Sequence, residues 1–351
     1  YRRQRQMCIR DRSIIQEEEK MMKTSKLFMT LPEAYACTPD GMEIDRYGNL
    51  ILSCPNYADE HMSGCVLRIT KDRRVEKWFD VPVHPETGVA RNMGIAFDGN
   101  WNIYLCDNQG WSERPELLYK GRVLKCEVDD AGNIKKTTVI ADHMEHPNGI
   151  RIRGEYMYVT QSYLHPVKDP SGKLVSCVYR FRLDEHDIDI TNTLEDPHIL
   201  TTFITQNPET QYGADGIAFD SAGNLYVGNF GDGEVWKLVL NQDGSLKEKS
   251  LFAKNPEELK STDGMVFDEN GNLYIADFCA NAIVKVTKDG YVSRLAQSPD
   301  CDGLDGGLDQ PGEPIIYDGK IVASCFDLVT GPGKVNTAHE MPATLAEVDI
   351  S

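Results

Sequence analysis

The sequence predicts an all-β protein, a six-bladed β-propeller with four antiparallel strands in each blade. The first observation is a segment that recurs six times along the 351 residues, most clearly as ADGIAFDSAGNLYV over residues 214–227. The second is its spacing: Gly41, Gly94, Gly149, Gly216 and Gly264 follow one another at intervals of 53, 55, 67 and 48 residues. Repeats of this length, with short apolar runs around Gly-Asn turns, are typical of propeller blades.

Each repeat holds enough short apolar runs for four strands. In the repeat headed by Asp215, strands are expected over residues 216–219, 225–227, 233–238 and 250–253. Third strands with alternating apolar residues recur at residues 66–69, 123–126, 178–181 and 283–286. Helical periodicity is absent from these segments, so the pattern favours β-structure alone.

The two ends of the chain are expected to complete one blade together. Residues 26–33 (KLFMTLPE) resemble residues 250–257 (SLFAKNPE), which form an outer strand and its exit loop. The N-terminal segment therefore supplies a fourth strand, and residues 344–348 supply the third strand of the blade that begins near residue 313. This closure removes the open edges of a linear array. We expect one propeller domain over residues 25–351.

Residues 1–24 are expected to be a lead-in that is either disordered or not native. The segment Met7–Arg12 (MCIRDR), within a basic and Gln-rich start, looks like a translated sequencing-adapter end. Residues 1–12 are therefore expected to be a sequence artefact and are excluded from the fold prediction.

The bulk composition excludes several classes of partner. The net charge of −18 disfavours binding to nucleic acid or to an anionic membrane. No apolar stretch approaches the ~20 residues that span a bilayer, and no secretory signal is recognised. The ten cysteines lack CxxC spacing, so we expect buried, reduced thiols and a cytoplasmic location. A small-molecule ligand and a monomer or weak homo-oligomer are expected.

An oxygen-bearing residue heads every repeat, just before its first strand. Because the first strand of each propeller blade lines the central channel, we expect these heads to converge around one opening. The six heads are Asp40, Asn92, Asn148, Asp215, Asp263 and Glu313. Four carboxylates this close would repel without a cation, and oxygen donors alone suit Ca²⁺, with Mg²⁺, Mn²⁺ or Zn²⁺ as alternatives. A single head is better explained as a turn residue, whereas six varied heads at equivalent positions favour a binding role.

The order of the heads resembles that of the senescence-marker-protein, gluconolactonase and luciferin-regenerating-enzyme family of six-bladed propellers. Diisopropyl-fluorophosphatase and the paraoxonases are more distant relatives of that family. Read cyclically from the last repeat, Glu313 in Gly-Glu-Pro takes the place of the family's Glu. Asn92 and Asn148 take the places of its two Asn residues, and Asp215 that of its Asp. Asp40 and Asp263 fall on the two blades that carry no ligand.

The resemblance implies a Ca²⁺ site formed by Glu313, Asn148, Asp215 and Asn92. It also implies substrate-binding roles for Asn92 and for Arg91, which takes the place of a substrate-binding Arg, with Asp40 close by. The reaction implied is hydrolysis of a sugar lactone or related ester, in which the metal polarises the carbonyl. Asp215 or Asp263 would activate the water, and Asp40 is a further candidate base.

Two other functions remain open at this stage. A propeller can be a non-catalytic scaffold that binds peptides or other macromolecules on its open face, because fold does not imply chemistry. Phosphotriester hydrolysis would use the same metal site.

Two further motifs are assigned structural roles. Residues 331–337 (GPGKVNT) lack the spacing of a phosphate loop and are expected to form a plain loop. His143 and His146 are expected to be structural rather than metal ligands.

Overall fold

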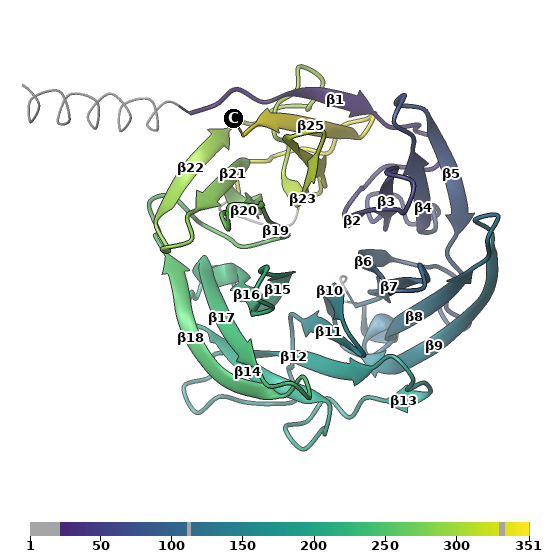
Figure 1. Cartoon of the computed structure of the whole chain (residues 1–351), viewed down its shortest axis with the longest axis vertical. Helices are drawn as coiled ribbons and strands as arrows, with labels where there is room; N and C mark the ends of the chain where they lie inside the picture. The colour runs from purple at the N-terminus through teal and green to yellow at the C-terminus, as the bar shows by residue number, and fades with distance from the viewer. Residues whose placement is uncertain (1–21, 111–113, 330–333, 351) are drawn as a thin grey trace, which may run out of the picture.

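The computed structural model describes residues 22–110, 114–329 and 334–350, and its sheets form a six-membered ring (Figure 1). Each blade is a four-stranded antiparallel sheet, apart from one extra strand in blade 2, and the prediction of a six-bladed propeller is confirmed. Blade 1 contains β2 (Met42–Ile44), β3 (Leu50–Cys54), β4 (Cys65–Ile69) and β5 (Val75–Asp80). Blade 2 contains β6 (Asn92–Phe97), β7 (Ile103–Asp107), β8 (Gly121–Val128), β9 (Ile134–Met144) and the added β13 (Ile188–Asp189).

The other blades follow in chain order. Blade 3 contains β10 (Pro147–Arg153), β11 (Tyr156–Gln161), β12 (Leu174–Arg182) and β14 (Ile199–Thr205). Blade 4 contains β15 (Ala214–Phe219), β16 (Leu225–Asn229), β17 (Glu234–Leu240) and β18 (Leu246–Lys254). Blade 5 contains β19 (Met265–Phe267), β20 (Leu273–Asp277), β21 (Ala282–Val286) and β22 (Val292–Gln297). The described helices are the 3₁₀ turns η1 (Pro115–Leu117), η2 (Phe230–Asp232) and η3 (Phe278–Ala280).

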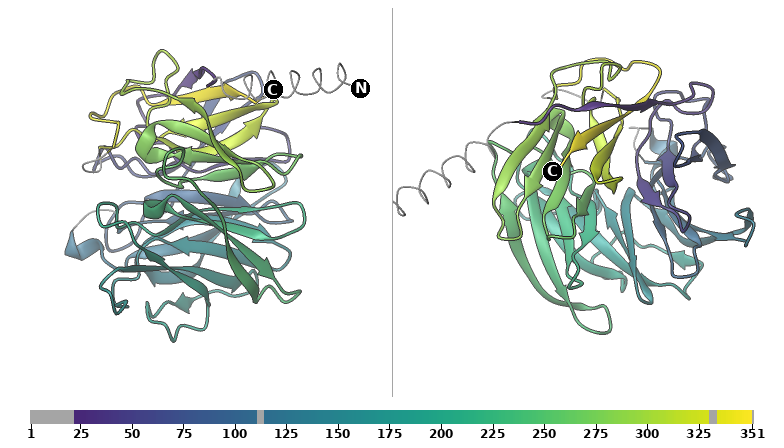
Figure 2. Two further views of the ribbon diagram at one scale, coloured as in Figure 1. Left: turned by 90° about the vertical axis from the view of Figure 1, so that its left-hand side faces the viewer. Right: turned by 45° about the horizontal axis from the view of Figure 1, so that its top comes forward.

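Blade 6 is built from both chain ends, as the sequence predicts. It contains β23 (Pro311–Tyr317), β24 (Lys320–Cys325), β25 (Thr344–Asp349) and β1 (Lys26–Thr30), and β1 lies along the outside of β25 (Figures 1 and 2). Residues 1–21 of the expected lead-in lie outside the described residues. Lys23, also in that lead-in, forms a β-bridge with Ala296 of blade 5.

The 67-residue interval between Gly149 and Gly216 has a structural cause. After β12 the chain leaves blade 3, and β13 pairs in parallel with β9 of blade 2 before β14 returns. The link adds residues outside the four-strand pattern, so this repeat is longer while its blade is unchanged.

Two local features explain why the same sequence motif recurs from blade to blade. In the β15–β16 turn, Asp220 accepts hydrogen bonds from the backbone and side chain of Asn224, while Gly223 adopts a positive φ of 84°. On the inner strands, a Cβ on Gly216 would meet the carbonyl oxygen of Asp263 in the next blade. Glycine at this position therefore lets adjacent inner strands approach closely around the channel.

The core lies within and between the blades, and the cysteines belong to it. Nine of the ten cysteines fall in the described residues; all nine are free, and seven are buried. Such thiols pack as small apolar side chains. Among the described residues no helix has the length and apolar character needed to cross a bilayer.

Candidate functional site

Strand register identifies which residues occupy equivalent positions at one end of the channel. In β15, Ala214 pairs with Asn229 and Ile217 with Val227, so Asp215 and Gly216 lie in the irregularity between these pairs. The inner strands β6, β10 and β23 have the same irregularity after their first pair. In β2 and β19 the pairing begins at the residue equivalent to Ile217, so all six blades can be aligned. The residues equivalent to Asp215 form the series Asp40, Met93, Asn148, Asp215, Asp263 and Gly312.

Asn92 does not belong to this series, because it precedes the aligned position by one residue. Its side chain is fully buried, and its amide nitrogen donates to Ser53 Oγ at 2.6 Å and to the Cys65 carbonyl at 3.0 Å. The structure thus places Asn92 among blade 1 residues, and Met93 faces the channel cavity instead. Aligning the repeats on Gly94 rather than on the polar residue would have revealed this offset.

Glu313 departs in the other direction, since it takes the position that Gly216 occupies in blade 4. Its carboxylate binds Arg151 of β10 at 2.5 Å, and both side chains are mostly buried, with 13% and 17% exposed. Burial raises the pKa of Glu313 to about 7 against the opposing effect of Arg151. Glu313 therefore pairs with an arginine deeper in the channel rather than standing with the other predicted ligands.

Arg91 is also held away from the cavity. Its guanidinium donates to the carbonyls of Pro55, Asn56 and Met62 at 2.9, 2.7 and 2.7 Å. These bonds clamp the loop that follows β3. The predicted substrate-binding Arg91 thus fixes a loop of blade 1 in this structure.

The carboxylates Asp40, Asp215 and Asp263 act on one another electrostatically; Asp40 and Asp215 are buried, and Asp263 is partly buried. Burial, followed by the charge of Glu313, raises the pKa of Asp40 to about 8. Burial and the charges of Asp40 and Glu313 raise the pKa of Asp215 well above its usual range. Burial and Asp215 do the same to the pKa of Asp263. The three side chains repel one another, which is the environment that a cation would relieve.

A cavity of about 320 Å³ opens at this end of the channel, and we call it the mouth cavity. Asn148, Asp215, Asp263 and Lys334 are among its polar lining residues. The Asn148 amide nitrogen donates to the Tyr212 hydroxyl at 3.0 Å, which leaves the side-chain oxygen on the opposite arm of the amide. With Glu209 and Gln211 from the loop before β15, the cavity therefore combines three acidic residues, two amides and a lysine.

An aromatic wall surrounds the mouth cavity and consists of Tyr163, Tyr212, Phe230, Phe278 and Phe326. Neighbouring rings are in contact: the centroids of Phe230 and Phe278, and those of Phe278 and Phe326, lie 5.7 Å apart. The Tyr212 ring lies 4.9 Å from Phe230 and 5.1 Å from Tyr163. This wall gives the cavity an apolar, water-excluding side.

The sequence prediction missed the aromatic wall and Lys334. Phe230, Phe278 and Phe326 each directly follow the second strand of a blade, at intervals of 48 residues. That regular spacing is a signal in the sequence that could have found them. Lys334 belongs to the expected plain loop, of which residues 331–333 lie outside the described residues. Its ammonium lies 4.8 Å from the Phe278 ring centroid, and burial lowers its pKa.

The two histidines are placed differently. His143 is exposed and binds Asp189 at 2.7 Å. His146 is fully buried, its ring stacks on Tyr163 at 4.8 Å, and burial lowers its pKa to about 3. His146 thus supports the aromatic wall as a neutral side chain.

No protein-family model matches the sequence, and no curated protein matches it either. Solved structures do match. Luciferin-regenerating enzyme has a TM-score of 0.62 at 11% identity, covering 93% of this chain and 95% of its own. The chain shares the six-bladed propeller fold of that enzyme. A calcium-binding regucalcin from Agrobacterium tumefaciens has a TM-score of 0.58 at 11% identity, and the match covers 93% of this chain and 94% of its own. A gluconolactonase from Xanthomonas campestris has a TM-score of 0.55 at 15% identity, and the match covers 93% of this chain and 94% of its own.

The propeller fold does not by itself decide the reaction. Virginiamycin B lyase from Staphylococcus aureus matches at a TM-score of 0.53 and 12% identity, covering 92% of this chain and 98% of its own. A similar propeller therefore belongs to a protein named for a lyase reaction. Any assignment must come from the mouth cavity.

The donors at the mouth fit a hard divalent cation, although they differ from the predicted set. Of the four predicted ligands, only Asn148 and Asp215 line the mouth cavity, and Asp263 lines it beside them. Two carboxylates and an amide oxygen are ligands of the kind that Ca²⁺ prefers. Within the described part of the chain, Asp40, Asp215 and Asp263 do not bring their oxygens within 4.8 Å of one another as a trio. One ion would thus take at most two of them in this geometry.

Proposed function

We propose that the mouth cavity is the active site of a metal-dependent hydrolase that acts on small lactones or esters. The observation that carries the proposal is that Asp215 and the partly buried Asp263 line a cavity of about 320 Å³, with the charge of the buried Asp40 acting on both. Regucalcin, which shares the fold, is described as a calcium-binding protein, and another propeller with this fold as a gluconolactonase. Both descriptions support the proposal as analogies.

Asp215, Asp263 and Asn148 would hold the cation, which we propose to be Ca²⁺. When bound, it supplies a Lewis acid that polarises the substrate carbonyl. The two carboxylates balance its charge, and the Tyr212 hydroxyl orients the amide of Asn148. Asp40 adds negative charge behind them.

Residues of the mouth cavity supply the remaining roles, which are proton transfer, substrate packing and stabilisation of the product. Asp263 accepts the backbone N–H of Gly264 at 2.9 Å, which fixes its carboxylate at the cavity wall. There it can take a proton from water, with Asp215 as the alternative base. The aromatic wall packs against the ring of the substrate and excludes bulk water. Lys334 stands at the same wall, where its ammonium favours the carboxylate that ring opening releases.

The test is hydrolysis of a panel that contains gluconolactone, an aromatic lactone and a phosphotriester. We expect lactone hydrolysis with Ca²⁺, and its loss in excess chelator with recovery on adding Ca²⁺. Activity on the phosphotriester alone would move the assignment to that chemistry. Lactone hydrolysis that chelation leaves unchanged, in the wild type and in Asp215→Asn alike, would contradict the proposal.

A second candidate is supported by the same cavity. Aromatic walls beside carboxylates bind organic ammonium ions through cation–π contacts. A non-catalytic binder would take up a quaternary ammonium such as tetramethylammonium in chelator and show no hydrolysis. Calorimetric titration with that ion, alongside the lactone panel, separates the two functions.

We also propose that the partner is a small molecule, and that the chain acts as a monomer or weak homo-oligomer in the cytoplasm. The net charge of −18 supports the exclusion of nucleic acid and anionic membranes as partners. The free, mostly buried cysteines support a reducing compartment.

A further inference from the structure

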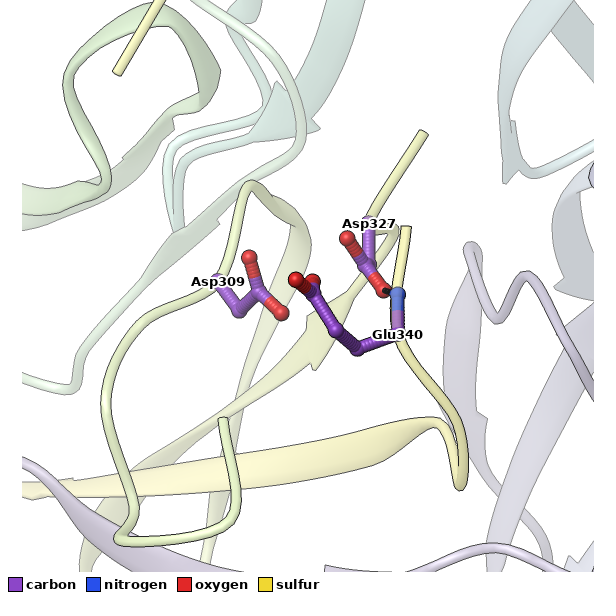
Figure 3. Close-up of side chains that lie close together, drawn as sticks. All are labelled: Asp309, Asp327 and Glu340. Carbon is purple, nitrogen blue, oxygen red and sulfur yellow. Dashed lines mark hydrogen bonds between the residues drawn. The ribbon is translucent and has the colours of Figure 1, made fainter. Parts of the chain in front are cut away.

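A second acidic group lies outside the mouth cavity, in blade 6. Asp309, Asp327 and Glu340 bring one carboxylate oxygen each within 4.8 Å of one another, and Figure 3 shows their carboxylates turned together. We call them the blade 6 cluster. Asp309 precedes β23, Asp327 follows β24, and Glu340 precedes β25. Three separate stretches of chain therefore meet at this cluster.

Two of the three cluster residues are buried, Glu340 is partly exposed, and the hydrogen bonding of the cluster is incomplete. Asp309 and Asp327 are 1% and 2% exposed. Asp309 Oδ1 and Glu340 Oε2 are buried without a hydrogen-bond partner among the described residues. Asp309 is turned toward the other two carboxylates (Figure 3). An almost wholly buried carboxylate oxygen that faces two other carboxylates without a donor is costly unless a cation completes its environment.

Neighbouring groups hold the Asp327 carboxylate in the orientation that a cation ligand needs. Its Oδ1 accepts the side-chain N–H of Asn336 at 3.0 Å, and its Oδ2 accepts the backbone N–H of Glu340 at 2.7 Å. His339 Nδ1 lies 3.1 Å from the same Oδ2. The Asn336 side-chain oxygen is also buried without a partner. It is a fourth oxygen donor within the same network.

The surroundings add negative charge and provide access. Glu340 also lines a surface cleft of about 790 Å³ together with Asp300, Asp302 and Asp305. None of the three cluster residues lines the mouth cavity. Burial and the charges of Asp327 and Glu340 also raise the pKa of Asp309, to about 8. A cation entering from the rim would reach the cluster without passing through the channel.

We propose that Asp309, Asp327 and Glu340 form a Ca²⁺ site, separate from the mouth cavity, that fastens the β24–β25 connection to blade 6. All donors are oxygens, which favours a hard cation, and opposite ligands of Ca²⁺ at ~2.4 Å are separated by about 4.8 Å. Mg²⁺ requires shorter bonds and a stricter octahedron. The same connection contributes Phe326 and Lys334 to the mouth cavity, so the site would support the cavity wall.

The experiment measures Ca²⁺ affinity by calorimetry and thermal unfolding of the full chain after metal removal. We expect Ca²⁺ at 100 times its Kd to raise the Tm by roughly 3–6 °C, and Mg²⁺ at the same concentration to raise it less. Asp309→Asn should weaken Ca²⁺ binding at this site by about tenfold or more. It should also abolish most of the rise in Tm that remains when the mouth site is removed by Asp215→Asn. In chelator, Asp309→Asn should melt no lower than the wild type, because it removes charge from a buried acidic group.

Three variants make the outcome decisive. Asp302→Asn removes the same charge from the adjacent cleft and should keep the Ca²⁺-dependent rise in Tm. Asp215→Asn removes a ligand of the proposed mouth site and should keep the part of the rise that the blade 6 cluster contributes, so a failure of the proposed function is distinguished from a failure of this site. Glu340→Gln serves as the second cluster variant should Asp309→Asn fail to fold. A Ca²⁺-dependent Tm rise that is the same in Asp215→Asn and in Asp215→Asn/Asp309→Asn, or an Asp215→Asn protein that does not respond to millimolar Ca²⁺, would overturn the proposal.

Discussion

The two ends of the central channel carry similar acidic residues in opposite electrostatic settings. At the mouth, Asp40, Asp215 and Asp263 raise one another's pKa. Deeper in the channel, Arg151 of β10 binds Glu313 at 2.5 Å, and its charge also opposes the rise in the pKa of Glu43 caused by burial. The deeper acids line a second cavity together with Arg151 as their counter-ion, whereas burial and neighbouring carboxylates raise the pKa of Asp215 at the mouth.

This difference arises from a single step in register. Glu313 occupies the position of an inner-strand glycine, so its side chain extends toward Arg151 rather than standing level with Asp215. Gly312, at the aligned position, has no side chain, and a Cβ there would lie 2.9 Å from Asp40 Oδ1. Acidic residues one position apart on an inner strand thus separate into a structural ion pair and a candidate cation site.

The sharpest test of the comparison exchanges charge for amide at each end. Asp215→Asn should lower kcat/KM for lactone hydrolysis by about 100-fold or more, equivalent to ~2.7 kcal/mol, because it removes a ligand of the proposed cation. Glu313→Gln should leave kcat/KM within a few fold. Steady-state kinetics at saturating Ca²⁺ would check both. Equal losses in the two variants would mean that both ends of the channel serve the reaction.

Arg151→Met tests the deeper pair through stability. It should lower the free energy of unfolding by about 3–5 kcal/mol once Glu313 is charged, because it leaves that carboxylate buried without its partner. The pKa of Glu313 is raised by folding to about 7, so its charged form is the disfavoured one in the folded state. Without Arg151 this pKa rises further. Below about pH 7 the folded state keeps Glu313 protonated with or without Arg151, so the loss should be smallest there. It should grow as the pH rises above about 7 toward the higher pKa of Glu313 in the variant.

Chemical denaturation of Arg151→Met across this pH range measures the effect. The double variant Arg151→Met/Glu313→Gln is the matched control and should recover much of the loss at pH 8. A loss that is independent of pH and persists in the double variant would show that Arg151 acts through packing rather than charge.

The architecture was predictable because the features that build a blade repeat in every copy. The Asp220–Asn224 turn and the close approach at Gly216 recur in the sequence wherever a blade must turn or pack, so strand order and ring closure follow from the spacing. The site was harder to predict. Asn92, Asn148 and Glu313 each look like the head of a repeat in the sequence. Strand pairing shows that Asn148 shares the position of Asp215 while the other two are offset by one residue, and only the offset of Asn92 could have been found by aligning the repeats on Gly94.

The aromatic wall offers a smaller test, which separates ligand binding from stability. Phe278→Leu should raise KM for an aromatic lactone about three- to tenfold, because ring contacts of this kind contribute ~0.5–1.5 kcal/mol. The matched control is Phe181→Leu, a fully buried phenylalanine of blade 3 that does not line the mouth cavity. It should lower the Tm without changing KM. A change in KM in both variants would indicate a general effect of core truncation.

Arg91→Met should have the smallest effect on activity, although Arg91 was predicted to bind substrate. Its guanidinium binds the carbonyls of Pro55, Asn56 and Met62. Losing these charge-assisted bonds should lower the free energy of unfolding by about 1–3 kcal/mol, with KM for the lactone unchanged within about twofold. Denaturation and steady-state kinetics on the same preparation give both quantities. A tenfold rise in KM with little loss of stability would restore Arg91 to the substrate site and show that the loop after β3 rearranges when the ligand binds.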